Sequence, residues 1–173
     1  MATALLDEAK GRVANTGKKL SDEDSKFLTF KLADEEYGVE ILKVREIIGV
    51  MEITAVPQMP TYTKGVINLR GKVIPVIDLR LKFGFQEIEY TEQTCIIVVN
   101  VGREIGIIVD TVSEVLDITE DNVEPPPEMT GSVDTAFILG MGKVGNAVKI
   151  LLDINRVLSA GEMAELAVPD ATF

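Results

Sequence analysis

Hydrophobic residues follow a polar N-terminal segment in short bursts that are separated by turn-forming residues. The burst 28–32 alternates apolar and polar positions with a period of two and leads into the acidic stretch 34–36, which predicts a half-buried strand entering a hairpin. Two further bursts, 66–69 and 73–77, flank a turn in which Gly71 can supply the positive φ of a tight hairpin. The pattern therefore predicts a mainly β chain.

Helical signals are few and short. Asp78 can cap a turn over 79–83, because its carboxylate reaches the free amides of the first turn. A capping-box pattern, Ser159-x-x-Glu162, predicts a second short helix near the end of the sequence. Residues 1–25 are charged and polar without a clear period, so we expect them to form a flexible N-terminal tail.

The sequence contains an internal duplication. Glutamate, glycine and aliphatic residues of 36–47 recur at the same positions in 104–115, and 76–79 matches 151–154, so that both copies end in an apolar run with an aspartate. The second copy is rich in β-branched residues, which favours strand over helix for 41–48 as well. The simplest interpretation is two related β modules of about five short strands, each curled into a small barrel so that few edges stay unpaired, with the two packed together.

Composition narrows the class of function. The chain has 17 basic and 28 acidic side chains, and its net charge of −11 repels phosphate backbones and anionic lipid. It has no histidine, which excludes Ser-His-Asp and Cys-His nucleophile pairs and HExxH zinc sites. Its single cysteine, Cys95, is interpreted as a small core residue. No apolar stretch approaches the roughly 20 residues that span a bilayer. We therefore expect a cytoplasmic protein that binds no nucleic acid and does not insert into the membrane.

One motif suggests a nucleotide-binding site. Gly140-x-Gly142-x-x-Gly145 matches the dinucleotide-binding pattern as a string, but that pattern works where the glycines open a helix. Residues 146–152 have the pattern of a strand, so a hairpin is favoured here. The carboxylates show no metal-loop spacing. No catalytic residue, cofactor or metal site is predicted, and a small nucleotide-binding protein stays open as an alternative.

Glu46 and Arg70 form a candidate polar pair. Glu46 lies near the end of the repeated motif, and Arg70 lies at the predicted hairpin turn. An arginine fork held by a carboxylate is a frequent anchor of interfaces, whereas an ordinary exposed ion pair contributes only about 0 to 1 kcal/mol. From these residues alone, an ordinary exposed ion pair is favoured over an interface anchor.

Several long segments carry a resemblance to a known family. Residues 36–47 and 64–80 of the first half, with 105–116 and 140–142 of the second half, resemble CheW-type chemotaxis coupling proteins. The similarity covers roughly residues 26–167, and the N-terminal tail looks like an extension.

The resemblance implies a fold and a function. The fold is mainly β, with two intertwined five-stranded SH3-like barrels and short helices; we place the first barrel at about 26–85 and the second at about 93–152, with 153–167 returning to the core. The implied function is a non-catalytic scaffold that couples the cytoplasmic tips of methyl-accepting chemoreceptors to the histidine kinase CheA in bacterial chemotaxis. Such a protein is cytoplasmic and associates with the membrane only through receptor complexes.

The resemblance also implies binding residues. In this family one barrel binds the regulatory domain of the kinase, and a hydrophobic groove between the barrels takes the receptor hairpin tip. The positions implied for the receptor groove are Val44, Gly106, Val112 and Val115. The positions implied for kinase or receptor contacts on the first barrel are Glu46, Lys64 and Arg70. On this mapping, Arg70→Ala and Val44→Asp weaken assembly without unfolding the protein.

Two other functions stay open at this point. One is a small purine-nucleotide-binding protein that holds its ligand through backbone, Asn or Arg contacts. The other is a coupling module of a related signalling array outside chemotaxis, for example one that controls surface motility or biofilm state.

Overall fold

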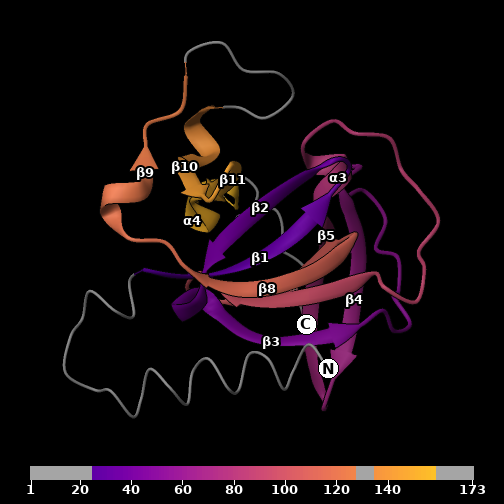
Figure 1. The fold of residues 1–173 in the computed structure, drawn as a ribbon. Coiled ribbons are helices and arrows are strands. Elements are labelled where there is room, and N and C mark those ends of the chain that lie inside the picture. Colours follow the sequence, from indigo (N-terminus) through magenta and orange to yellow (C-terminus); the bar gives the residue numbers. More distant parts are fainter. Residues whose placement is uncertain (1–24, 128–134, 159–173) are drawn as a thin grey trace.

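The computed structural model describes residues 25–127 and 135–158, which form two β-sheets with short helical turns (Figure 1). Nearly all of the predicted N-terminal tail, up to residue 24, and the predicted capping box at Ser159 lie outside the described residues. The mainly β fold class is confirmed. None of the helices in the described ranges has the length and apolar character needed to cross a membrane.

Sheet A has six strands and sheet B has five. The order in sheet A is β8-β1-β2-β11-β10-β9, with bounds β1 (Lys26–Leu32), β2 (Glu35–Glu40), β8 (Thr111–Asp117), β9 (Val123–Glu124), β10 (Ile138–Val144) and β11 (Ala147–Leu152). The order in sheet B is β3-β6-β7-β5-β4, with bounds β3 (Val44–Gly49), β4 (Thr63–Leu69), β5 (Lys72–Asp78), β6 (Cys95–Asn100) and β7 (Glu104–Val109). We call the two units barrel A and barrel B. The helical turns are η1 (Ile41–Lys43), α3 (Leu79–Lys82), η2 (Glu120–Asn122), η3 (Thr135–Phe137) and α4 (Ile154–Val157).

The internal duplication is visible in the order of the elements. The first copy runs β1-β2-β3-β4-β5-α3, and the second runs β6-β7-β8-β10-β11-α4, with the short β9 added. Each sheet takes the first hairpin of one copy and the last three strands of the other, because β1 and β2 join sheet A while β6 and β7 join sheet B. The predicted division into barrels at 26–85 and 93–152 therefore does not describe the hydrogen-bonded sheets, since the copies exchange hairpins.

The chain passes from one sheet to the other at two crossovers. The first is η1, a single turn of 3-10 helix at 41–43, and the second is Asp110, between β7 and β8. The sequence predicted strand throughout 41–48, and this is wrong for 41–43. The chain leaves sheet A after Glu40 and enters sheet B at Val44, and the turn makes that change of direction. The prediction is correct for the rest of the segment, which lies in β3.

The largest hydrophobic core lies between the two sheets and draws side chains from both. Phe30 and Tyr37 of sheet A pack there with Ile47 and Ile107 of sheet B. A smaller core fills barrel B and a still smaller one fills barrel A. Helix α4 returns to the shared core through Ile154, which is the return predicted for 153–167 as far as the described residues reach. Because the barrels share their main core, burial of apolar surface holds them together as one body.

Local signals in the sequence are confirmed at the ends of the strands. The backbone N–H of Arg80 donates to Asp78 Oδ1 at 3.0 Å and caps α3 as predicted, and the duplicated Asp153 caps α4 in the same way. The predicted glycine hairpin is also present, because β10 and β11 are joined at Gly145. A Cβ at Gly140 would lie 2.4 Å from Val123 Cγ1, so this glycine allows the close packing of β9.

The titration of Tyr37 gives a test of the shared core. The ring stacks on Phe30 with centroids 6.0 Å apart, and burial, followed by the Glu35 carboxylate, raises the pKa of Tyr37 to about 12. Folding therefore favours the protonated phenol. The stabilisation that this gives to the folded state is complete below pH 10 and is lost as the pH rises to 12. We expect the free energy of unfolding to fall by about 2 kcal/mol over that interval because of this group. Urea denaturation should show a smaller fall for Tyr37→Phe, and equal falls would refute the assignment.

Candidate partner-binding site

The structure brings Glu46 and Arg70 together, as the sequence suggested. Glu46 lies on β3, Arg70 lies in the two-residue turn between β4 and β5, and the Arg70 guanidinium donates to Glu46 Oε1. Strands β3 and β4 stand at opposite ends of sheet B, so this contact joins the two edges. A backbone bridge between Thr54 and Val66 joins the chain after β3 to β4 as well, with N···O distances of 2.8 and 2.9 Å. Two separate contacts thus join the edges of sheet B and close barrel B.

Arg70 has an unfavourable backbone conformation for its residue type. Its φ is +52°, in the left-handed region, and the φ of Gly71 is +86°. Two positive φ values are typical of the two-residue hairpin turn that also places Leu69 opposite Lys72. For a residue with a Cβ this region costs roughly 1 kcal/mol, which glycine or asparagine largely avoids. The turn alone does not account for an arginine here, and the side chain is 70% exposed, so its guanidinium is available to a partner.

Lys64 lies on the same barrel but not beside this pair. It is six residues from Arg70 along β4, which corresponds to about 20 Å of strand. Its ammonium pairs with Glu87, and the two side chains line an open depression of about 410 Å³ together with Ile88, Glu89 and Tyr90. The three predicted contact residues therefore share barrel B but divide between two places on it.

The predicted groove residues separate into a buried pair and a half-buried pair. Val44 has no exposed surface, and a Cβ at Gly106 would lie 2.8 Å from Ile96 Cγ2, so both positions are interior. The prediction that these two positions line a surface groove is corrected. The Val44 side chain packs in the shared core, and the buried backbone of Gly106 lies close to Ile96. Val112 and Val115 are half-buried on the edge strand β8 and pack against the shared core. Of the four positions, only Val112 and Val115 have surface that a partner could reach.

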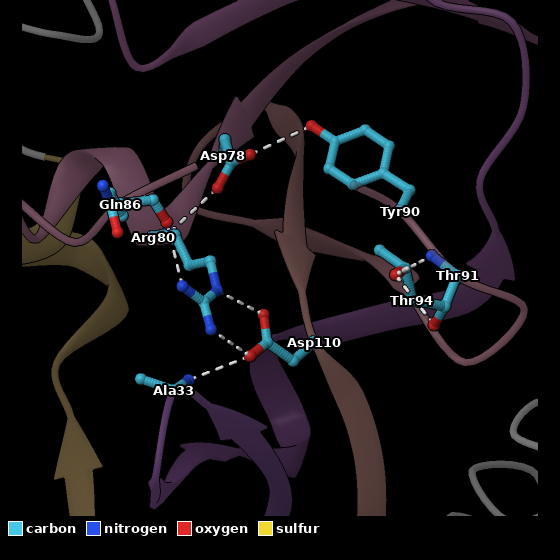
Figure 2. A network of polar contacts seen from close by, with 8 residues as sticks. All are labelled: Ala33, Asp78, Arg80, Gln86, Tyr90, Thr91, Thr94 and Asp110. Carbon is cyan, nitrogen blue, oxygen red and sulfur yellow. Dashed lines mark hydrogen bonds and ion pairs between the residues drawn. The ribbon is translucent and has the colours of Figure 1, made fainter. Parts of the chain in front are cut away.

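A polar network holds the second crossover in place (Figure 2). The Arg80 guanidinium donates to both carboxylate oxygens of Asp110 at 2.8 and 2.9 Å, and also to the carbonyl of Gln86 at 2.9 Å. Asp110 accepts a further bond from the backbone N–H of Ala33 at 2.9 Å. The hydrogen bond that Arg80 donates to Asp110 raises the pKa of Arg80 above its ordinary value. The network ties the β1–β2 turn of barrel A to α3, which follows β5 of barrel B.

The loop that follows α3 is hydrogen-bonded to Asp78, the residue that caps α3. The hydroxyl of Tyr90 donates to Asp78 Oδ2 at 2.9 Å, and burial, with the charge of Asp78, raises the pKa of Tyr90 (Figure 2). Farther along, the backbone N–H of Thr91 donates to Thr94 Oγ1 at 2.8 Å. The sequence analysis missed this network, because its members are far apart in the chain. One signal was available: Asp110 interrupts the apolar run of the repeat at the point where the chain changes sheets.

Cys95, predicted to be a core residue, is only half-buried at the start of β6, and burial raises the pKa of its thiol. Among residues 25–127 and 135–158 no cluster of three or more histidine, cysteine or acidic side chains has metal-site geometry. The described residues offer an exposed arginine on barrel B and a half-buried aliphatic pair on barrel A.

Comparison with known proteins gives consistent results. A family model described as the CheW-like domain matches residues 26–162. The chain is 45% identical to the chemotaxis protein CheW of Klebsiella aerogenes over 152 residues, which are 86% of this chain and 92% of that protein. It is 35% identical to that of Helicobacter pylori, over 89% of this chain and 93% of that protein. The crystal structure of the scaffolding protein TtCheW from Thermoanaerobacter tengcongensis is similar, with a TM-score of 0.74, 38% identity, and coverage of 80% of this chain and 95% of that one.

Proposed function

The chain belongs to the CheW-like domain family and is a chemotaxis coupling adaptor, and we propose that it joins chemoreceptor cytoplasmic tips to the histidine kinase CheA without a catalytic step of its own. The observation that carries this proposal is the 45% identity to a chemotaxis protein CheW over 92% of that protein. The described surfaces support it, because they lie on one body that shares a core. In this proposal the protein works in the cytoplasm and reaches the membrane only through receptors.

The mechanism follows from simultaneous binding. When one rigid body holds a receptor and a kinase, the encounter between those two becomes effectively intramolecular. A change of receptor conformation can then reach the kinase only if the assembly has different affinities for the kinase states. The shared core and the Arg80–Asp110 network keep the two barrels in a fixed relation, so a shift at one surface is not absorbed inside the scaffold.

The binding roles of individual residues remain proposals. We assign the receptor contact to Val112 and Val115, since this aliphatic pair can receive the apolar face of a helix. We assign kinase or receptor contacts to Arg70, held by Glu46, and to Lys64. A nucleotide-binding role is not favoured, because the glycine pattern lies in a β-hairpin where the phosphate-binding helix would have to begin.

Substitution of Val115 tests the receptor contact. We expect Val115→Asp to weaken binding of a receptor signalling fragment at least tenfold, because a carboxylate would be desolvated under a partner helix. The side chain is half-buried on an edge strand, so the protein should remain folded. This variant replaces Val44→Asp, which would place a charge in the core and unfold the protein. Sedimentation of the receptor fragment with the variant measures the effect.

A matched control is available on barrel A. Val148→Asp makes the same chemical change on β11, at a valine that is 50% exposed. It should bind the receptor fragment as the wild-type protein does. If both variants bind equally well, Val115 does not contact the receptor.

A further inference from the structure

The two copies of the duplication differ in what lies over one face of their barrel. After α3 the chain continues along barrel B, where Glu87 pairs with Lys64 of β4. After α4 the described residues end at Leu158, and the sequence continues with residues 159–173. The duplication therefore indicates where the second of these segments would lie.

Lys64 of β4 and Leu139 of β10 occupy the same position in the two copies. Each is the extra residue of a β-bulge, because the register of β4 on β5 shifts within 63–65 and that of β10 on β11 shifts within 138–140. A bulge re-aims the side chain that it carries. The two side chains therefore leave their barrels at equivalent places.

The capping aspartates stand in the same relation to these bulges. The backbone N–H of Asp78 donates to the carbonyl of Tyr62 at 2.8 Å, and that of Asp153 donates to the carbonyl of Phe137 at 2.9 Å. Both accepting residues lie just before the bulged strand of their copy. The chain therefore enters α3 and α4 from equivalent places.

The sequences after the two helical turns also correspond. Phe83 and Leu158, each five positions after its capping aspartate, are both buried in the shared core. Four positions farther along, 87–88 is Glu-Ile and 162–163 is Glu-Met. Residues 87–90 line the depression beside the bulged lysine of barrel B. The matching residues of the second copy, 162–165, are therefore the expected neighbours of the bulged leucine.

The surface around this leucine is more apolar than its counterpart. Positions 62–64 are Tyr-Thr-Lys in barrel B, whereas positions 137–139 are Phe-Ile-Leu in barrel A. Leu139 is 45% exposed, and Phe137 and Ile138 are half-buried beside it. A single exposed leucine is ordinary on a protein surface. This one ends an apolar run and stands where the other copy has a lysine that pairs with the segment after α3.

The sequence after α4 has the apolar side chains that would match this surface. Met163 and Leu166 are three positions apart, so they would lie on the same side of the short helix that Ser159-x-x-Glu162 predicts. The glutamate that pairs with lysine in the first copy is replaced in the second by the glutamate of the capping box. An apolar contact would therefore take the place of the ion pair.

We propose that residues 159–166 fold back over β10 and bury Leu139 beneath Met163 and Leu166. Burial of apolar surface favours this contact, and the entropy lost on closing the loop is small because the segment starts at a residue already fixed in the core. This face of barrel A is then occupied from within the chain rather than by a receptor, a kinase or a second copy. The inference uses the duplication and the described contacts, and it does not rest on the proposed function.

The test follows the reactivity of an introduced thiol in the full chain. Leu139→Cys is compared with Val148→Cys, at a valine that is 50% exposed near the other end of the same hairpin, both in a Cys95→Ser background. Each is also combined with Met163→Asp and Leu166→Asp, which should release the segment because a carboxylate resists burial against an apolar surface. The rate of reaction with iodoacetamide is measured for all four chains.

We expect the two aspartates to speed the reaction of the Leu139→Cys thiol about fivefold or more, and that of the Val148→Cys thiol less than about twofold. An unchanged rate at Leu139→Cys would mean that the segment does not cover β10. Protection that is lost on dilution would assign the cover to a second copy. Protection that needs an added receptor signalling fragment or kinase regulatory domain would assign it to a partner. Each of these three results would overturn the proposal.

A disulfide tests the placement of the segment in the same background. Leu139→Cys with Met163→Cys should form an intramolecular disulfide in oxidised glutathione, because the bond requires the two Cα atoms to lie within about 7 Å. Val148→Cys with Met163→Cys is the control and should stay reduced. Disulfides that form equally fast in both chains would show that the segment has no fixed place on barrel A, and the proposal would be wrong.

Discussion

Gly65→Ala should lower the free energy of unfolding by about 4 kcal/mol, near the upper end of single-substitution effects. Gly65 lies on β4 with φ at +143°, a conformation that residues with a Cβ rarely adopt. A Cβ built there would lie 2.0 Å from the carbonyl oxygen of Thr54, which is backbone and cannot rotate away. To make room, the chain must give up the bridge between Thr54 and Val66 that helps to close barrel B. Urea denaturation followed by circular dichroism measures the loss.

Gly102 provides the control for Gly65. Its φ is +99°, but a Cβ there would meet no atom within 4 Å. Gly102→Ala therefore introduces backbone strain without a clash, and should cost only about 1 kcal/mol. The difference between the two variants isolates the steric clash. If Gly65→Ala is no more destabilising than Gly102→Ala, the close approach of Thr54 to β4 is wrong.

Asp110→Ala should have the second largest effect, a loss of about 3 kcal/mol in the free energy of unfolding. The variant removes the acceptor of two bonds from Arg80 and one from the backbone of Ala33. The Arg80 side chain is only 15% exposed, so its guanidinium would be left mostly desolvated without its carboxylate. Because the network ties barrel A to α3, we also expect receptor-dependent kinase activation to fall.

The control for Asp110 is another ion-paired aspartate. Asp117 pairs with Lys26 at 3.4 Å but is 50% exposed, so Asp117→Ala should cost no more than about 1 kcal/mol. A second measurement uses Arg80→Leu together with Asp110→Ala. Removing both partners should restore part of the stability, because no unpaired charge is left behind. Equal stability of the two single aspartate variants would mean that the network does not hold the crossover.

Much of the local structure can be predicted from short stretches of sequence. The hairpin turn at Arg70 and Gly71 and the caps at Asp78 and Asp153 are each encoded within a few residues. The duplication is visible because matching side chains occupy matching positions in both copies. Each of these features depends on contacts between neighbours in the chain, and such contacts leave a periodic or spaced pattern.

The exchange of hairpins between the two copies leaves no such pattern in the sequence. A strand that alternates apolar and polar residues can pair with either copy, so the same sequence fits two separate barrels or two exchanged ones. The structure selects the exchanged arrangement, in which β1 and β2 pair with β8 and β11. The helical turn at 41–43, where strand was predicted, follows from this arrangement, since that segment must cross between the sheets.

The placement of the binding residues could also be predicted only in part, because it depends on contacts between distant parts of the chain. Glu46 and Arg70 could be paired from sequence, because one ends a repeated motif and the other occupies a turn. The family resemblance placed Val44 in a surface groove, although its side chain is fully buried. Periodicity could not correct this, because it does not show which face of β3 meets the other barrel. Arg45 and Lys72 both pair with Glu104, which lies far from both in the sequence. These contacts therefore leave no local pattern from which they could be predicted.

Receptor-dependent autophosphorylation of CheA is the first measurement to make, because it shows whether this chain couples receptors to the kinase. Membranes or vesicles carrying receptor signalling fragments are incubated with CheA, and phosphorylation is followed with and without this chain. We expect the chain to enter the sedimented complex and to raise the rate of phosphorylation. Val115→Asp should fail to raise the rate, and Val148→Asp should raise it as the wild-type chain does. If the wild-type chain stays out of the complex and the rate is unchanged, the chain is not the coupling scaffold.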